Sequence, residues 1–233
     1  MSAFIAKFFK GAALAVGLAL PGLASAATVS LVYNGGTSNG WVTITNAPTA
    51  TASGSLPLNV GAYGFKMTDT TGQMGMFTAF CVDISHWLQN SGVYDTTLTP
   101  FTNSYAVNAG SMARIQALFD ANYATLVLSN AVQAAGFQAA LWNALYDTDW
   151  LAGSGAFAVR DGTSGATAQA NAFLLAAQNY SGAQRYNMTF LQARTYNQNL
   201  ITVAPVPLPA AGGLLLLGLG GLALLRRGRK RAA

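Results

Sequence analysis

The sequence contains few of the residues from which most catalytic and metal sites are built. Only 8% of its 233 residues are charged, it has one cysteine and one histidine, and all seven acidic residues are aspartates. A single cysteine excludes an internal disulfide, and one cysteine with one histidine cannot complete a zinc site. The aspartates lack the spacing of an EF-hand loop. We therefore expect no metal, no cofactor and no enzyme of ordinary turnover.

The positive charge is concentrated at the two ends of the chain. Two of the twelve Lys and Arg residues lie in residues 1–26 and five in residues 226–233, which leaves five between these segments against seven aspartates. The part between the ends is therefore slightly acidic, and its basic residues are scattered singly. The sequence pI of about 9.5 comes from the ends, so the composition predicts no nucleic-acid partner.

Both ends have the composition of export segments. Residues 1–26 contain two lysines, an apolar run and Ala24-Ser25-Ala26, which is typical of a cleaved signal peptide. Near the other end, a linker with a VPLPA motif spans 204–209, an apolar helix 210–225 follows, and a basic cytoplasmic tail spans 226–233. Arginines at the end of such a short apolar run can snorkel and let it span a membrane. The segment 27–203 is then a single exported ectodomain.

The ectodomain is expected to have an α+β fold, with a β-rich first half and helices in the second half. Short runs rich in Val, Thr and aromatics, separated by turn residues, predict strands within 28–34, 40–45, 55–60, 63–69 and 74–84. The apolar run at 74–84 is typical of a buried central strand. From Ser111 the pattern has helical spacing, which predicts helices near 111–119, 131–145 and 166–177. A last strand is expected within 195–205.

One polar residue stands in an apolar stripe of the second predicted helix. Gln138 shares a helical face with apolar residues from Ala131 to Leu145. A buried amide without a partner costs about 1–3 kcal/mol. Gln138 is therefore either hydrogen-bonded to the backbone, or it has reacted with another group.

Cys81 and His86 are the other two candidates for chemistry. A lone thiol in an exported chain is buried and inert, intermolecular, or reactive. A Cys81–His86 nucleophile pair would allow acyl transfer, although no protease signature surrounds the cysteine. A third possibility is attack of the Cys81 sulfur on the side-chain carbonyl of Gln138 with loss of ammonia. The resulting thioester would leave an apolar crosslink in a dry site.

Two short motifs around Cys81 and Gln138 resemble those of the thioester domains of bacterial surface adhesins. FCVD contains Cys81, and FQAALW contains Gln138, Ala140, Leu141 and Trp142 where that family has T-Q-x-A-[I/L]-W. The resemblance implies that Cys81 and Gln138 form an internal thioester that captures an amine or hydroxyl on a partner surface. Phe137 departs from the family pattern, which has threonine at this position.

The C-terminal segment resembles the VPLPA variant of the PEP-CTERM sorting signal. The motif residues are Val206, Pro207, Leu208, Pro209 and Ala210, followed by an apolar helix and an arginine-rich end. The resemblance implies an exosortase as processing partner, membrane anchoring before processing, and a final place on the surface or in the extracellular matrix of a Gram-negative bacterium.

The function expected from the sequence is that of an exosortase-sorted surface protein acting as a covalent adhesin. The alternative is a non-reactive structural protein of the matrix, associated with exopolysaccharide, in which Cys81 and Gln138 are merely packed. A Cys-His hydrolase that uses Cys81 and His86 is the third possibility.

Overall fold

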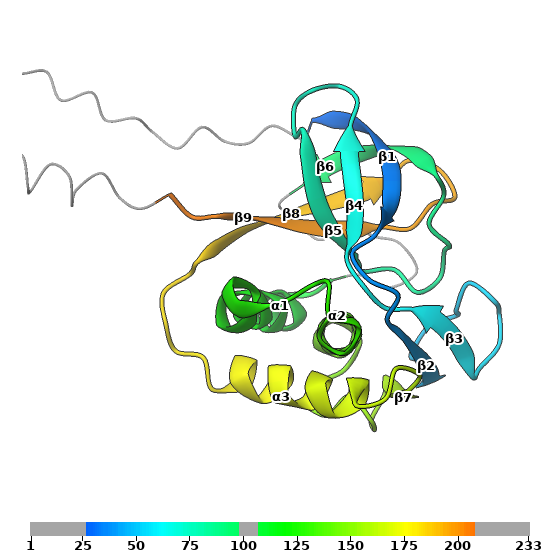
Figure 1. Ribbon diagram of the computed structural model, residues 1–233, viewed down its shortest axis with the longest axis vertical. Helices are drawn as coiled ribbons and strands as arrows, with labels where there is room; N and C mark the ends of the chain where they lie inside the picture. The colour runs from blue at the N-terminus through cyan, green and yellow to red at the C-terminus, as the bar shows by residue number, and fades with distance from the viewer. Residues whose placement is uncertain (1–26, 98–106, 208–233) are drawn as a thin grey trace, which may run out of the picture.

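The computed structural model describes residues 27–97 and 107–207, and these form a barrel with three helices on one side of it (Figure 1). The predicted signal peptide, the membrane helix 210–225 and the basic tail lie outside the described residues, as do Leu208, Pro209 and Ala210. Within the described residues no helix is long and apolar enough to cross a membrane.

Six strands close the barrel in the order β1-β4-β5-β9-β8-β6, and every neighbouring pair is antiparallel. Their bounds are β1 Thr28–Gly36, β4 Phe65–Asp69, β5 Met76–Cys81, β6 Ser91–Thr97, β8 Tyr186–Ala193 and β9 Leu200–Pro205. A separate three-stranded sheet has the order β3-β2-β7, with β2 Trp41–Asn46, β3 Leu58–Gly61 and β7 Ala158–Asp161.

The predicted mixture of a β-rich first half and a helical second half is observed, but the second half also supplies barrel strands. β6 and β8 were not predicted, because most of their side chains are only partly buried and their sequences lack a clear apolar alternation. β7 was not predicted either, because four residues are too few to show a pattern. The strand expected within 195–205 begins only at Leu200. β9 continues to Pro205 and pairs with β8 there, so Ala204 and Pro205, the first residues of the expected linker, belong to the barrel.

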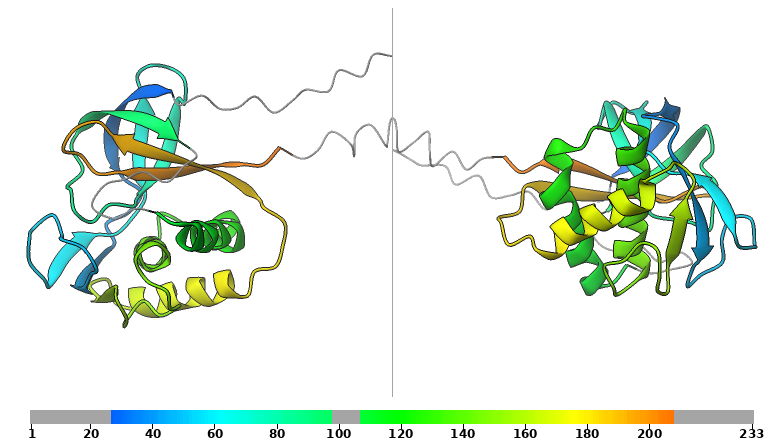
Figure 2. Two further views of the ribbon diagram at one scale, coloured as in Figure 1. Left: turned by 180° about the vertical axis from the view of Figure 1, so that it is seen from behind. Right: turned by 60° about the horizontal axis from the view of Figure 1, so that its bottom comes forward.

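The three predicted helices are present as α1 Ala109–Asn122, α2 Ala131–Tyr146 and α3 Ala166–Gln178, with a short 3-10 turn η1 at Tyr123–Thr125. Asn108 and Ser111 form a capping box at the start of α1, and the Asn130 side chain accepts two backbone N–H groups at the start of α2. α1 and α2 lie nearer the barrel than α3 does (Figure 1 and the left view of Figure 2).

α2 is the central helix of the molecule. We predicted one apolar face, but every residue from Ala134 to Tyr146 is buried, because α1, α3, β2 and β5 all pack against the helix. Gly136 allows the close approach of α3: a Cβ atom there would lie 2.8 Å from Cβ of Gln169 and 3.0 Å from the backbone N of Ala170. A helix buried on all sides leaves its polar side chains dependent on protein partners.

Aromatic rings join α2 to the barrel beside the predicted site. The rings of Phe80 on β5 and Phe137 on α2 are 5.2 Å apart, and both rings contact Phe119 of α1. Each of the first two residues directly precedes a predicted site residue, Cys81 or Gln138. Phe137, the departure from the adhesin motif, is therefore part of the contact that holds α2 against β5, and aromatic pairs of this kind contribute about 0.5–1.5 kcal/mol each.

Candidate functional site

Cys81 and Gln138, 57 residues apart in the sequence, are hydrogen-bonded to each other in the core. The Cys81 backbone N–H donates to Oε1 of Gln138 at 3.1 Å, and the amide Nε2 donates to the Cys81 carbonyl oxygen at 2.8 Å. The exposed fraction is 1% for Cys81 and 0% for Gln138. The amide that was unexplained in the sequence is therefore paired with the backbone of the residue that carries the lone thiol.

Three side chains of α2, spaced four residues apart, face the end of β5. Gln138 binds the Cys81 backbone, the Trp142 indole lies near the Cys81 sulfur, and the Tyr146 hydroxyl donates to the carbonyl of Val82 and accepts from the N–H of Ile84. The i, i+4, i+8 spacing puts all three on one helical face. One row of a buried helix thus fixes the backbone conformation of the chain where it leaves β5.

The environment of the Cys81 sulfur keeps it a neutral thiol. The thiol donates to the Asp83 carbonyl oxygen at 3.2 Å, and the Asp83 N–H lies 3.4 Å from the sulfur. Burial raises the pKa of Cys81 far above its ordinary value; the Asp83 backbone and the Trp142 indole act in the opposite direction, and the negative Asp83 carboxylate adds to the rise. An unassisted cysteine nucleophile requires the reverse, a lowered pKa.

His86 is paired with Asp83 and not with the thiol. Its Nδ1 lies 2.8 Å from Oδ2 of Asp83, whose carboxylate is fully buried and also accepts from the backbone and hydroxyl of Ser85. The side chain of His86 is 30% exposed. A hydrolase would require His86 to pair with Cys81, but His86 pairs instead with Asp83, which stands two positions after Cys81 in the sequence.

Two buried polar groups that interact with Cys81 make no hydrogen bond to a nitrogen or oxygen atom of the described residues. They are the Trp142 indole N–H and the Tyr94 hydroxyl. Burial raises the pKa of Tyr94, and its electrostatic interaction with Cys81 raises it further, so the hydroxyl remains a proton donor. Unsatisfied donors of this kind are uncommon in native cores. Both could stabilise negative charge that forms on the sulfur.

The aspartates and the exposed tryptophans lie apart from the Cys81–Gln138 pair or have other partners. Within 27–97 and 107–207 no group of three or more His, Cys or Asp side chains is arranged to hold a metal. α2 ends at Tyr146, and the carboxylates of Asp147 and Asp149 accept backbone N–H groups of the following turn. Of the tryptophans, Trp41 and Trp87 are exposed, whereas Trp150 packs on Arg114.

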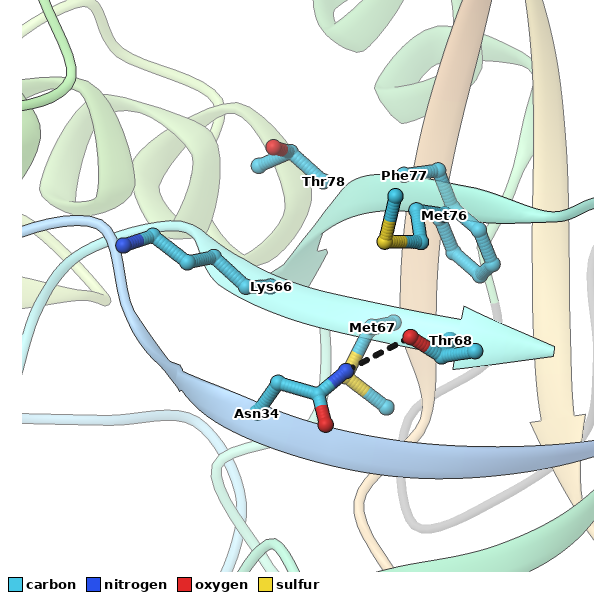
Figure 3. A pocket seen from close by; sticks show the side chains of 7 residues that line it. All are labelled: Asn34, Lys66, Met67, Thr68, Met76, Phe77 and Thr78. Carbon is cyan, nitrogen blue, oxygen red and sulfur yellow. Dashed lines mark hydrogen bonds between the residues drawn. The ribbon is translucent and has the colours of Figure 1, made fainter.

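A shallow pocket on the barrel is separate from the Cys81–Gln138 pair. Figure 3 shows side chains from β1, β4 and β5 around it, with a 2.7 Å hydrogen bond from Asn34 to Thr68. The lining includes Lys66, the one lysine of the ectodomain, but none of the predicted site residues.

Several residues of the site were missed in the sequence. Asp83, Tyr146, Gln198 and Asn199 hydrogen-bond to Cys81 or its neighbours, and Tyr94 interacts electrostatically with Cys81. Two of them had a usable signal: Tyr146 is spaced eight residues from Gln138, and Asp83 stands two residues after Cys81 in the FCVD motif. Tyr94 comes from β6, and Gln198 and Asn199 come from the β8–β9 connection, which meets the end of β5 only when the barrel closes.

Comparison with known proteins gives structural neighbours only, since no family model and no curated protein matches the sequence. The chain is similar to the N-terminal thioester domain of a surface protein from Clostridium perfringens, with 10% identity, a TM-score of 0.40, and coverage of 71% of this chain and 99% of that one. It is also similar to the N-terminal domain of the Streptococcus pyogenes pilus tip adhesin Cpa, with 12% identity, a TM-score of 0.37, and coverage of 72% and 94%. At these scores the functional conclusion has to come from the chemistry of Cys81 and Gln138.

Proposed function

We propose that this protein is a covalent adhesin in which Cys81 and Gln138 form an internal thioester. The observation that carries the proposal is the pair of reciprocal hydrogen bonds between the Gln138 amide and the Cys81 backbone. These bonds hold a buried carboxamide against the backbone of the residue that carries the one thiol of the chain, and both residues are buried.

The bond forms by attack of the Cys81 sulfur on Cδ of Gln138. The thiol proton is transferred to the amide nitrogen, the C–N bond breaks, and ammonia leaves. The Cys81 N–H already donates to Oε1, so it lies where an oxyanion would form. The product lacks both the S–H and the amide N–H donors, and burial protects it from hydrolysis.

Capture of a partner transfers the acyl group of Gln138 from the Cys81 sulfur to a nucleophile of the partner. An amine or hydroxyl attacks the acyl carbon, the C–S bond breaks, and the Cys81 sulfur recovers a proton. The partner is then linked to Gln138 through an amide or ester bond. The indole N–H of Trp142, which already interacts with the Cys81 thiol, and the Tyr94 hydroxyl would stabilise the departing sulfur. Each molecule reacts once, which distinguishes this chemistry from turnover by a hydrolase.

The competing function is a structural matrix protein in which the same two residues are only packed. One observation favours it: the Cys81 backbone already satisfies both polar atoms of the Gln138 amide, so the folded state needs no covalent bond. The two functions predict different masses for the same protein.

Intact mass of the purified protein, kept free of amine buffers, separates the two functions. The thioester predicts a mass lower than that of the sequence by one ammonia, and this deficit disappears in Cys81→Ala and in Gln138→Ala. Gln178→Ala, an exposed glutamine on α3, is the matched control and retains the deficit. A wild-type protein of full mass with a thiol that alkylates after denaturation would refute the thioester.

The export signals supply the destination that a covalent adhesin requires. We propose that residues 1–26 direct export and that an exosortase processes the chain at the VPLPA motif, after anchoring by 210–225. Replacing Pro207 and Pro209 by alanine should keep the protein in the inner-membrane fraction. Unchanged transfer to the cell surface or matrix would contradict this part of the proposal.

A further inference from the structure

Two connections of the barrel cover the end of β5 where Cys81 lies. They are the β5–β6 connection, 82–90, and the β8–β9 connection, 194–199. Nε2 of Gln198 donates to the carbonyl oxygens of Asp83 at 3.1 Å and His86 at 3.0 Å, and the Gln89 N–H donates to Oδ1 of Asn197 at 2.9 Å. These bonds hold the two connections together as one cover over the sulfur.

A single residue, Asp83, links the buried sulfur to the outer side of this cover. Its backbone contacts the Cys81 thiol, and its carboxylate binds Nδ1 of His86. With the Nδ1 proton directed to the carboxylate, the lone pair of the imidazole is on Nε2, for which no hydrogen bond to a described residue exists. His86 is therefore an oriented, partly exposed base that is connected to the Cys81 thiol through Asp83.

Exposed aromatic rings flank this base. Trp87 is 49% exposed and Tyr196 is 90% exposed, and the Tyr196 ring centre lies 6.0 Å from that of His86. Large exposed aromatics on adjacent connections mark an interaction surface. Since Trp87 lies on one connection and Tyr196 on the other, a ligand that contacts both rings would span the cover.

The polar side chains around these rings are uncharged. The exposed residues that follow Trp87 on its connection include Gln89, Asn90 and Ser91. The neighbouring Arg194 is paired with Asp95 at 2.8 Å, and the Asp83 carboxylate is buried. A lysine-rich protein surface would find no free carboxylate here, whereas aromatic rings with amides and hydroxyls are suited to the faces and hydroxyl groups of a neutral sugar.

We propose that the nucleophile captured by this protein is a hydroxyl group of a neutral polysaccharide, bound on Trp87 and Tyr196 and deprotonated by His86. This inference rests on the proposed thioester. A neutral amine attacks an acyl carbon without help, but a sugar hydroxyl is protonated near neutral pH and gains from a positioned general base. A lysine amine is mostly protonated near neutral pH, but its neutral fraction needs no further base, so an Asp-oriented histidine contributes more to the second nucleophile than to the first.

The step balances as a transacylation. The sugar oxygen attacks the acyl carbon of Gln138 while its proton moves to Nε2 of His86. The C–S bond then breaks, and the imidazolium returns the proton to the Cys81 sulfur. The products are an ester on the side chain of residue 138 and a free thiol. Since both reacting residues are buried, the 82–90 connection must shift outward to admit the hydroxyl. Because Trp87 belongs to that connection, a ligand bound to Trp87 would favour the shift.

The test is a competition between neutral sugars and an amine. The purified protein is incubated with maltopentaose, cellopentaose and a lysine-containing pentapeptide, and adducts are identified by mass and by peptide mapping. The proposal predicts an oligosaccharide ester at position 138 that hydroxylamine removes. His86→Gln should lower the ratio of sugar ester to peptide amide by about 100-fold or more, the usual contribution of a general base. Trp87→Ala should lower sugar capture, and Trp41→Ala, an exposed tryptophan on β2, is its matched control.

Methylamine separates failure of this inference from failure of the thioester. A protein that captures methylamine and the lysine peptide but no sugar overturns the inference and leaves the thioester intact, as does an equal loss of both adducts in His86→Gln. A protein that captures nothing and shows no ammonia deficit overturns the thioester itself.

Discussion

Opening the proposed thioester should measurably destabilise the fold. The bond would join residues 57 positions apart. By the loop-closure relation used for disulfides, a crosslink of this span stabilises the folded state by about 4 kcal/mol. Methylamine cleaves the bond and leaves an N-methyl amide, whose single N–H can again donate to the Cys81 carbonyl and so restore about 1 kcal/mol. The net expected loss is therefore about 3 kcal/mol.

Thermal and urea unfolding of the same preparation, before and after methylamine, measure this loss. For a domain of this size, a loss of about 3 kcal/mol lowers Tm by about 6–12 °C. Cys81→Ala, which has no crosslink to open, should give the same Tm with and without methylamine. If the wild-type Tm is equally insensitive although the methylamine adduct is present, the crosslink adds nothing to stability and the loop-closure reasoning is wrong.

Two further predictions concern the packing and the ionisation of the site. Gly136→Ala should lower the free energy of unfolding in urea by about 1 kcal/mol, because overpacking against Gln169 at 2.8 Å costs more than the gain in helix propensity. Gly153→Ala is the control: its nearest contact is at 3.5 Å, so stability should change by less than about 0.5 kcal/mol. Equal effects of the two substitutions would contradict this packing argument. In Gln138→Met no thioester can form, so the Cys81 thiol is free. Because burial raises the pKa of this thiol in the folded state, the thiol ionises only in the unfolded state as pH rises. The stability of this variant should therefore be nearly constant below about pH 8.5 and fall by up to about 1.4 kcal/mol per pH unit between about pH 8.5 and 9.5, where tyrosines are still mostly protonated. A slope that persists in the double variant with Cys81→Ala would assign it to another group.

The sequence predicts those features that depend on local patterns. Helical spacing of apolar residues located α1, α2 and α3, since each helix satisfies its own backbone hydrogen bonds and needs only a neighbour to cover its apolar side chains. The apolar run at 74–84 identified the buried strand β5, which is Met76–Cys81 and lies between β4 and β9. Three strands were missed: β6 and β8 are half-exposed, and β7 has only four residues, so the pattern that reveals a strand was weak in all three.

The candidate site likewise has some features that the sequence predicts and others that only the tertiary structure determines. The sequence by itself identified a lone thiol and an amide in an apolar helix, because both are unusual residue types for their surroundings. It also predicts two export segments, which lie largely outside the described residues. Only the tertiary structure decided that Gln138 is bound to the backbone of Cys81. A sequence cannot predict such a partner, because nearly every residue has the same backbone N–H and carbonyl groups. It also decided that His86 pairs with Asp83, three residues before it in the 82–90 connection, and not with Cys81, whose buried thiol donates to the Asp83 carbonyl.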